Sequence, residues 1–258
     1  MTKTQLSWLE SAYGQSFLYT ERGYIENELR RIIGPRVLQV GNMIEQQQLA
    51  ALDFPQLVTI RAEQDLASGN LASGNKDFEN SSLIIADAAF LPFEPESFSS
   101  VILPHVLEGH GQPHQVLRET YRVLRPEGCL LMTGFNPFSL LGVQKYLRAK
   151  ACYNGQYFGV KRVRDWLQLL GFEVIGSAMY QYAPLSASER LTRGMNFYNA
   201  VGDRWLPLSG GAYMISARKR VGGFTLVGSE RLSHRRKQRQ KLAVSAAASE
   251  KRNNGDLL

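Results

Sequence analysis

Short apolar segments alternate with amphipathic helical patterns along most of the chain, and this alternation restricts the fold more than any other feature. The apolar segments have the length of strands and are rich in Val, Ile and Leu, whereas the segments between them repeat apolar residues every three or four positions. Strands that are separated by helices pair in parallel, and the helices then cover both faces of the sheet. The sequence therefore predicts an α/β fold, with strands at residues 37–40, 57–60, 82–87, 98–105, 129–136, 173–180 and 212–220.

The helical patterns also divide the chain into parts. The pattern at 5–33 precedes the first strand and predicts an N-terminal helical cap over residues 1–33, ahead of an α/β domain over 34–222. Further helices are expected at 44–52, 112–128 and 160–172. Residues 66–75 read LASGNLASGN, a tandem copy whose Gly, Ser and Asn content predicts a flexible loop.

Charge is concentrated at the C-terminal end of the chain. The net charge is +7, and residues 229–258 carry eight Lys or Arg against three Asp or Glu, which leaves +2 for the preceding part. The segment 223–258 is poor in large apolar residues, so we expect a basic, disordered tail. Such a tail could attract the phosphates of RNA, but it lacks the interleaved aromatic residues that stack on bases, so a nucleic-acid partner is not favoured.

Composition points to a cytoplasmic protein. No run of 18 apolar residues and no signal-peptide pattern occurs, and Cys129 and Cys152 do not form a disulfide framework. Oligomeric state cannot be read from the sequence.

Polar and glycine residues follow several of the predicted strands. In open parallel sheets, ligands bind beyond the carboxyl ends of the strands. Gly41, Asp87, His105 and Asn136 occupy these positions, and they are the first candidates for a binding site.

Residues 87–137 resemble a known family. The segment has an Asp at the end of a strand, then LPF, an acidic turn, SFSSV, a strand and LRETYRVLRPEG before the next strand. This order resembles class I S-adenosylmethionine-dependent methyltransferases of the type 11 group, and the whole chain is similar to a small uncharacterised bacterial branch of it. The resemblance implies a Rossmann-like sheet of seven strands, with strands six and seven forming a late hairpin, and S-adenosylmethionine as cofactor.

The resemblance assigns cofactor contacts residue by residue. The glycine-rich motif of the family would place glycines at positions 41, 43 and 45, and only Gly41 is present, so the first contacts are expected from Val40, Gly41 and Asn42. The carboxylate that holds the ribose would be Glu63 or Asp65. Asp87 and Ala88 match the position that binds the adenine amino group, and His105 is expected beside the cofactor.

Catalytic residues are less well indicated. Methyl transfer needs a base only when the acceptor proton is tightly held, and His105 or an N-terminal tyrosine, Tyr19 or Tyr24, could then serve. The alternative for His105 is a neutral core histidine that is hydrogen-bonded to backbone. His110 and His114 are four residues apart, but GQP interrupts any helix between them, so no metal site is expected.

The acceptor is left open by the resemblance. It implies a substrate lid built from the N-terminal helix and two insertions near 136–160 and 181–210, whose many aromatic residues favour a small or lipid-like acceptor. Two alternatives stand beside this interpretation. One is a binding module without catalysis, in which the reduced glycine motif still holds the cofactor or holds nothing, and the basic tail docks a partner. The other is an RNA methyltransferase recruited by the basic tail.

Overall fold

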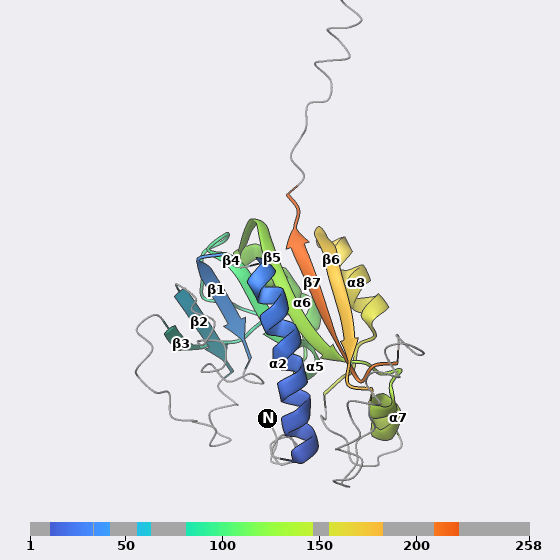
Figure 1. Cartoon of the computed structure of the whole chain (residues 1–258). Helices are drawn as coiled ribbons and strands as arrows, with labels where there is room; N and C mark the ends of the chain where they lie inside the picture. Colours follow the sequence, from blue (N-terminus) through green and yellow to red (C-terminus); the bar gives the residue numbers. More distant parts are fainter. Residues whose placement is uncertain are drawn as a thin grey trace, which may run out of the picture. The chain divides into compact units, whose positions relative to one another are not determined.

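The computed structural model describes residues 11–32, 34–41, 56–62, 81–146, 155–182 and 209–221. Within these ranges the chain forms one seven-stranded sheet with helices on both faces (Figure 1). The helices are α2 (Ala12–Ile32), α5 (Val106–Gly109), α6 (Pro113–Val123), α7 (Leu140–Tyr146) and α8 (Val160–Leu169). The strands are β1 (Arg36–Val40), β2 (Gln56–Arg61), β3 (Ser81–Ile85), β4 (Phe98–Pro104), β5 (Leu124–Phe135), β6 (Phe172–Tyr180) and β7 (Ala212–Lys219).

The strand order confirms the predicted fold class. The sheet runs β3-β2-β1-β4-β5-β7-β6, so the order reverses at β1, with β4 as its other neighbour. Strands β1 to β5 pair in parallel, whereas β7 lies antiparallel to both β5 and β6 and forms the late hairpin with β6. The carboxyl ends of the parallel strands meet at one edge of the sheet, and this edge holds the candidate site.

Two hydrophobic clusters cover the two faces of the sheet. On one face, α2 packs across β1, β4, β5 and β7 through Phe17, Ile25 and Leu29, each at most 1% exposed. On the other face, Val116 and Leu117 of α6 and Val163 and Leu167 of α8 are buried against the strands. The compact unit that contains the sheet extends to Val221 and includes α2, so this helix is part of the sheet domain.

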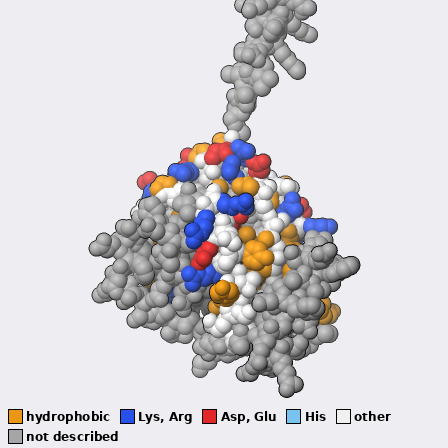
Figure 2. Space-filling model, in the orientation of Figure 1, with side chains coloured by type: hydrophobic (Ala, Val, Ile, Leu, Met, Phe, Trp, Pro, Cys, Tyr) orange, Lys and Arg blue, Asp and Glu red, His pale blue; other side chains and the backbone are white. Residues whose placement is uncertain are grey.

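The outer face of α2 is charged, as Figure 2 shows on the side of the molecule that this helix covers. Arg22 pairs there with Glu26, which lies one helical turn further along. Nη1 of Arg31 lies 3.7 Å from Oε2 of Glu28. This division into an apolar inner stripe and a charged outer face is what holds a 21-residue helix against a sheet. None of the helices that the structure describes has both the length and the apolar character needed to span a membrane.

Some expected boundaries differ from the observed ones. The helix expected over 112–128 ends at Val123, because β5 begins at Leu124, which pairs with Phe98 of β4 and is fully buried. Pro126 therefore lies in the strand, where the register is irregular, and Glu127 has a φ of 60°. The expected helix at 44–52 and the repeat at 66–75 lie outside the described residues.

Candidate active site

The carboxyl edge of the sheet brings together most of the residues that the sequence singled out. Gly41 continues from β1 and donates its N–H to the carbonyl of Ile60 at 2.9 Å, while Ala86 donates to Arg61 at 3.0 Å. His105 follows β4 and donates its N–H to the carbonyl of Thr133 at 3.3 Å. Since these bonds extend the ladder beyond the strands, Gly41, Asp87, His105 and Asn136 all lie at this edge.

Gly41 has a conformation and surroundings that suit only glycine. Its φ is +96°, which side chains rarely adopt, and a Cβ built on it would lie 2.9 Å from Cγ2 of Val106 and 3.5 Å from the carbonyl oxygen of Pro104. The backbone at the end of β1 can therefore turn closely against the segment after β4. Val40 is 2% exposed and belongs to the core, so only its backbone can face a ligand at the edge. Asn42 and Glu63, the other two expected contacts of this part, lie outside the described residues.

Asp87 presents a carboxylate just beyond β3. Its Oδ1 accepts a hydrogen bond from the N–H of Ala89 at 2.8 Å and lies 2.8 Å from Nε2 of His110, while the side chain stays 52% exposed. The bond from Ala89 lowers the pKa of Asp87, partial burial opposes this, and the bond with His110 lowers the pKa further. Asp87 is thus an ionised acceptor that is open to solvent, and its neighbour Ala88 is buried.

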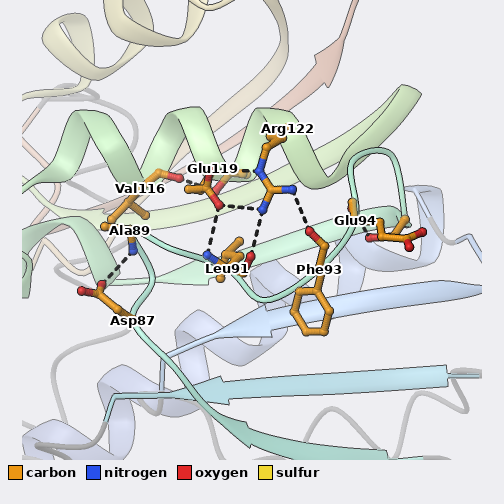
Figure 3. A network of polar contacts seen from close by, with 10 residues as sticks. Asp87, Ala89, Leu91, Phe93, Glu94, Val116, Glu119 and Arg122 are labelled. Atoms are coloured by element: carbon orange, nitrogen blue, oxygen red, sulfur yellow. Dashed lines mark hydrogen bonds and ion pairs between the residues drawn. The ribbon is translucent and has the colours of Figure 1, made fainter.

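The loop that carries Asp87 is held by two side chains of α6 (Figure 3). Glu119 accepts from the N–H of Leu91 at 3.0 Å, and Arg122 donates to the carbonyls of Leu91 at 2.9 Å and Phe93 at 2.7 Å. The two side chains also bind each other, with Nη2 of Arg122 at 2.7 Å from Oε2 of Glu119. These bonds lower the pKa of Glu119 and raise that of Arg122, so both stay charged and fix the loop after β3.

His105 lies in a buried charged cluster. Its Nε2 is 2.9 Å from Oε1 of Glu21 and its Nδ1 is 3.3 Å from Oε1 of Glu108, with all of these side chains at most 1% exposed. Tyr180 donates its hydroxyl to the same Glu21 oxygen at 3.0 Å. The residue is buried, as the core alternative expected, but its ring partners are two carboxylates, not backbone.

The charges in this cluster are set by its members. Burial alone would lower the pKa of His105, but the charge of Glu21 and the hydrogen bonds that the ring donates to Glu108 and Glu21 raise it to about 10. Burial would raise the pKa of Glu21, yet the charge of His105 lowers it. Burial and the nearby charge of Glu21 raise the pKa of Tyr180 well above its usual value. The imidazole is therefore an imidazolium at neutral pH, and it has no lone pair with which to accept a proton.

Neither of the two expected tyrosines contacts the ring of His105 in the described contacts. Tyr19 is 81% exposed, because two positions along a helix turn its side chain about 200° away from that of Glu21. Tyr24 stacks on Tyr180 with ring centroids 5.1 Å apart, and it is Tyr180 that reaches the charged cluster. The structure thus does not bring Tyr19 together with His105.

Glu21, Glu108 and Tyr180 are site residues that sequence reasoning missed. A signal for Glu21 was present. Tyr13, Phe17, Ile25 and Leu29 belong to a stripe with a four-residue spacing, and Glu21 occupies its middle position. A charged residue inside an apolar stripe indicates a buried partner. Among the described residues, no group of three or more His, Cys, Asp or Glu side chains is arranged to hold a metal ion.

Part of the chain is similar to a known protein family. Residues 43–132 match the family model described as "Methyltransferase domain". The chain is 37% identical over 144 residues to the "Uncharacterized protein YafS" of Escherichia coli (strain K12), which covers 55% of this chain and 56% of that protein. It is 26% identical over 120 residues to the "Demethylmenaquinone methyltransferase" of Protochlamydia amoebophila (strain UWE25), covering 45% of this chain and 47% of that one. The chain thus aligns with about half the length of these curated relatives.

A solved structure shares the fold of this chain. An S-adenosylmethionine-dependent methyltransferase from Thermotoga maritima superposes with a TM-score of 0.54 at 16% identity, covering 81% of this chain and 94% of that one. At this identity the likeness concerns the fold. Over residues 43–132 the chain thus matches a methyltransferase-domain model, and its sheet has the strand order of the class I Rossmann-like fold.

Proposed function

We propose that the chain transfers a methyl group from S-adenosylmethionine to a small or lipid-like acceptor. The observation that carries this proposal is the pairing of a positive-φ Gly41 with an open, ionised Asp87 at the edge where the sheet order reverses. Together they offer a closely approachable backbone and a hydrogen-bond acceptor, the contacts that the family uses for this cofactor. S-adenosylmethionine lacks a pyrophosphate, so one close-approach glycine meets the need that a longer glycine motif serves for dinucleotides.

The residues would divide the work along the edge. The backbone of Val40 and Gly41 would face the cofactor beyond β1, and Asp87 would accept a hydrogen bond from an amino group of the adenine. Glu119 and Arg122 would keep Asp87 in place by holding its loop. The cofactor supplies a methyl group that is already activated on a sulfonium. The chain then has to align the acceptor with it and exclude water, and such positioning can contribute about 7–11 kcal/mol.

General-base catalysis by His105 does not fit its surroundings. A buried imidazolium between two carboxylates can neither reach an acceptor nor take up its proton. We therefore infer that His105 does not act as the general base. The expectation for Tyr19 also loses support, since this side chain faces solvent on the outer side of α2.

An apolar acceptor is supported by exposed side chains at the start of the first insertion. Phe138, Leu140, Val143 and Tyr146, on and just before α7, are 79%, 53%, 49% and 88% exposed. Apolar groups gathered on a short exposed helix are typical of a surface that meets an apolar ligand. The name of one relative gives demethylmenaquinone as its acceptor, which is also apolar.

Calorimetry with S-adenosylmethionine and S-adenosylhomocysteine tests the proposal. We expect the intact protein to bind S-adenosylhomocysteine with a Kd of about 1–100 µM, and Asp87→Ala to weaken binding at least about tenfold, or 1.4 kcal/mol. Asp165→Ala on the exposed side of α8 is the matched control and should bind like the wild type.

A protein that binds neither compound, once copurified cofactor has been excluded by mass spectrometry of the denatured sample, would overturn the proposal. That result would favour a binding module without catalysis.

A further inference from the structure

The buried cluster around His105 connects elements that are far apart in the sequence. Glu21 comes from α2, Glu108 from α5 and Tyr180 from the end of β6, and the ring of His105 lies between the two carboxylates. Phe17 of α2 and Phe135 of β5 pack against the same ring, with centroids 5.8 Å and 4.1 Å away. One imidazole thus contacts the N-terminal helix and the ends of the central strands.

Glu108 extends this connection to the first insertion. Its Oε1 accepts from the N–H of Phe135 at 2.7 Å, at the last residue of β5. Its backbone carbonyl accepts from the N–H of Gln156, which follows α7 in the sequence, at 2.7 Å. Both sides of the segment that begins at 136 and returns at 156 are therefore bonded to Glu108.

The second insertion begins and ends beside the same residues. Tyr180, bonded to Glu21, is the last residue of β6 before this segment, and Gly211 donates its N–H to the carbonyl of Gln181 at 2.8 Å where the chain returns. Asn136 then links the two insertions, because its N–H and its Nδ2 donate to the carbonyls of Gly211 and Gly210 at 2.9 Å and 3.0 Å. The ends of both insertions are therefore joined by hydrogen bonds.

A protonated His105 supplies a positive charge and an N–H to each of the two buried carboxylates. The charged or titratable groups that face the ring or its carboxylates are Glu21 of α2, Glu108 of α5, Tyr180 of β6 and Tyr213 of β7, with the hydroxyl of Thr133 of β5 beside them. A neutral ring could donate only one N–H, so one buried carboxylate would lose its contact with a ring N–H, and both would lose the counter-charge. Removing one partner of a buried ion pair is strongly unfavourable.

We propose that Glu21 and His105 are positioning residues: the protonated imidazole, kept in place by Glu21, anchors α2 and the ends of both insertions, and so sets the shape of the acceptor side of the site. Only the description of this side as the acceptor side rests on the proposed function. The anchor itself depends on no bound cofactor.

Nuclear magnetic resonance of the ring nitrogens and hydrogen exchange test the anchor. In the wild type, both nitrogens of His105 should stay protonated at about pH 8.5, where an ordinary histidine is neutral. In Glu21→Gln the proton should be lost at a lower pH, since one of the two carboxylate charges has gone. Glu26→Gln, on the outer face of the same helix, should leave the titration of His105 unchanged.

Exchange at the insertion ends separates positioning from simple packing. We expect protection of the amides of Phe135, Asn136, Gln156 and Gly211 in Glu21→Gln to fall at least about tenfold at pH near 8.5 but less than about threefold at pH near 6, where the ring is still protonated. An equal loss of protection at both pH values would show a packing defect alone and would overturn the proposal.

The proposal remains testable if Glu21→Gln does not fold. A neutral His105 ring at pH near 8 in the wild-type protein would overturn it without any variant. Titration with S-adenosylhomocysteine keeps the two proposals apart, because a wild type that fails to bind this compound contradicts the proposed cofactor site, whereas the protonation of His105 is measured on the free protein.

Discussion

Oε1 of Glu21 lies 2.9 Å from Nε2 of His105, which joins the middle of the N-terminal helix to the end of the fourth strand. Both side chains are fully buried, and Glu108 approaches the ring from its other nitrogen at 3.3 Å. In open parallel sheets, ligands bind beyond the carboxyl ends of the strands, which is where His105 lies. Here that position holds a residue of a buried ion pair.

The stability of the protein should depend on pH through His105. Because its pKa is raised from 6.5 to about 10 in the folded chain, the stabilising contribution is fully present below pH 6.5 and is lost as the pH rises through 10. Urea denaturation of the wild type should therefore show falling stability over this window, by a few kcal/mol, and His105→Gln should show a flatter profile. Parallel profiles for the two proteins would contradict the expected linkage.

The hydroxyl of Tyr180 should contribute measurably to stability. It donates to a buried carboxylate, so Tyr180→Phe removes a charge-assisted hydrogen bond and should lower the free energy of unfolding by about 1.5–3 kcal/mol. Tyr146→Phe, at an 88% exposed position, is the matched control and should change it by less than about 0.5 kcal/mol. Equal effects of the two substitutions in chemical denaturation would argue against a buried bond at Glu21.

Gly41 should not tolerate a side chain. Gly41→Ala combines a φ of +96° with a Cβ 2.9 Å from Val106, so we expect a loss of about 1–3 kcal/mol in stability and weaker binding of S-adenosylhomocysteine. Gly23→Ala provides the contrast, since nothing lies within 4 Å of the added carbon in the middle of α2. That variant should be more stable by about 0.5–1 kcal/mol. Thermal denaturation would refute the reasoning if both variants moved in the same direction.

Arg122 should act on cofactor binding from a distance. Arg122→Gln removes donors to Leu91 and Phe93, so the loop that carries Asp87 should loosen, with a loss of about 1–2 kcal/mol in stability. We also expect an increase of at least about threefold in the Kd for S-adenosylhomocysteine. Arg118→Gln, on the exposed side of the same helix, is the control. If calorimetry finds wild-type affinity in Arg122→Gln, the loop does not need this clamp.

Several features of the site were predictable because they depend on short-range patterns. The end of a buried strand is visible in the apolar run itself, so the sequence alone was enough to place Gly41 and Asp87 at the carboxyl edge. The family resemblance of residues 87–137 was confirmed by the matched model over 43–132. The seven-stranded sheet with its late hairpin was confirmed as well. The end of the helix at Val123 was missed, because a proline and a glycine a few residues later suggested a helix stop and not a strand start.

The charge and partners of His105 were decided by tertiary structure alone. The sequence determined that a histidine follows the fourth strand, and it contained a glutamate within the apolar stripe of the N-terminal helix. Whether the two side chains meet depends on how α2 crosses the sheet, which is settled by the packing of Phe17, Ile25 and Leu29 against strands distant along the chain. A histidine in water titrates near neutrality. It becomes a lasting cation here because folding places two carboxylates beside the ring, and their effect on the pKa exceeds the opposing effect of burial. Local sequence patterns specify which segments form strands and helices, whereas electrostatics depends on which groups the fold brings together.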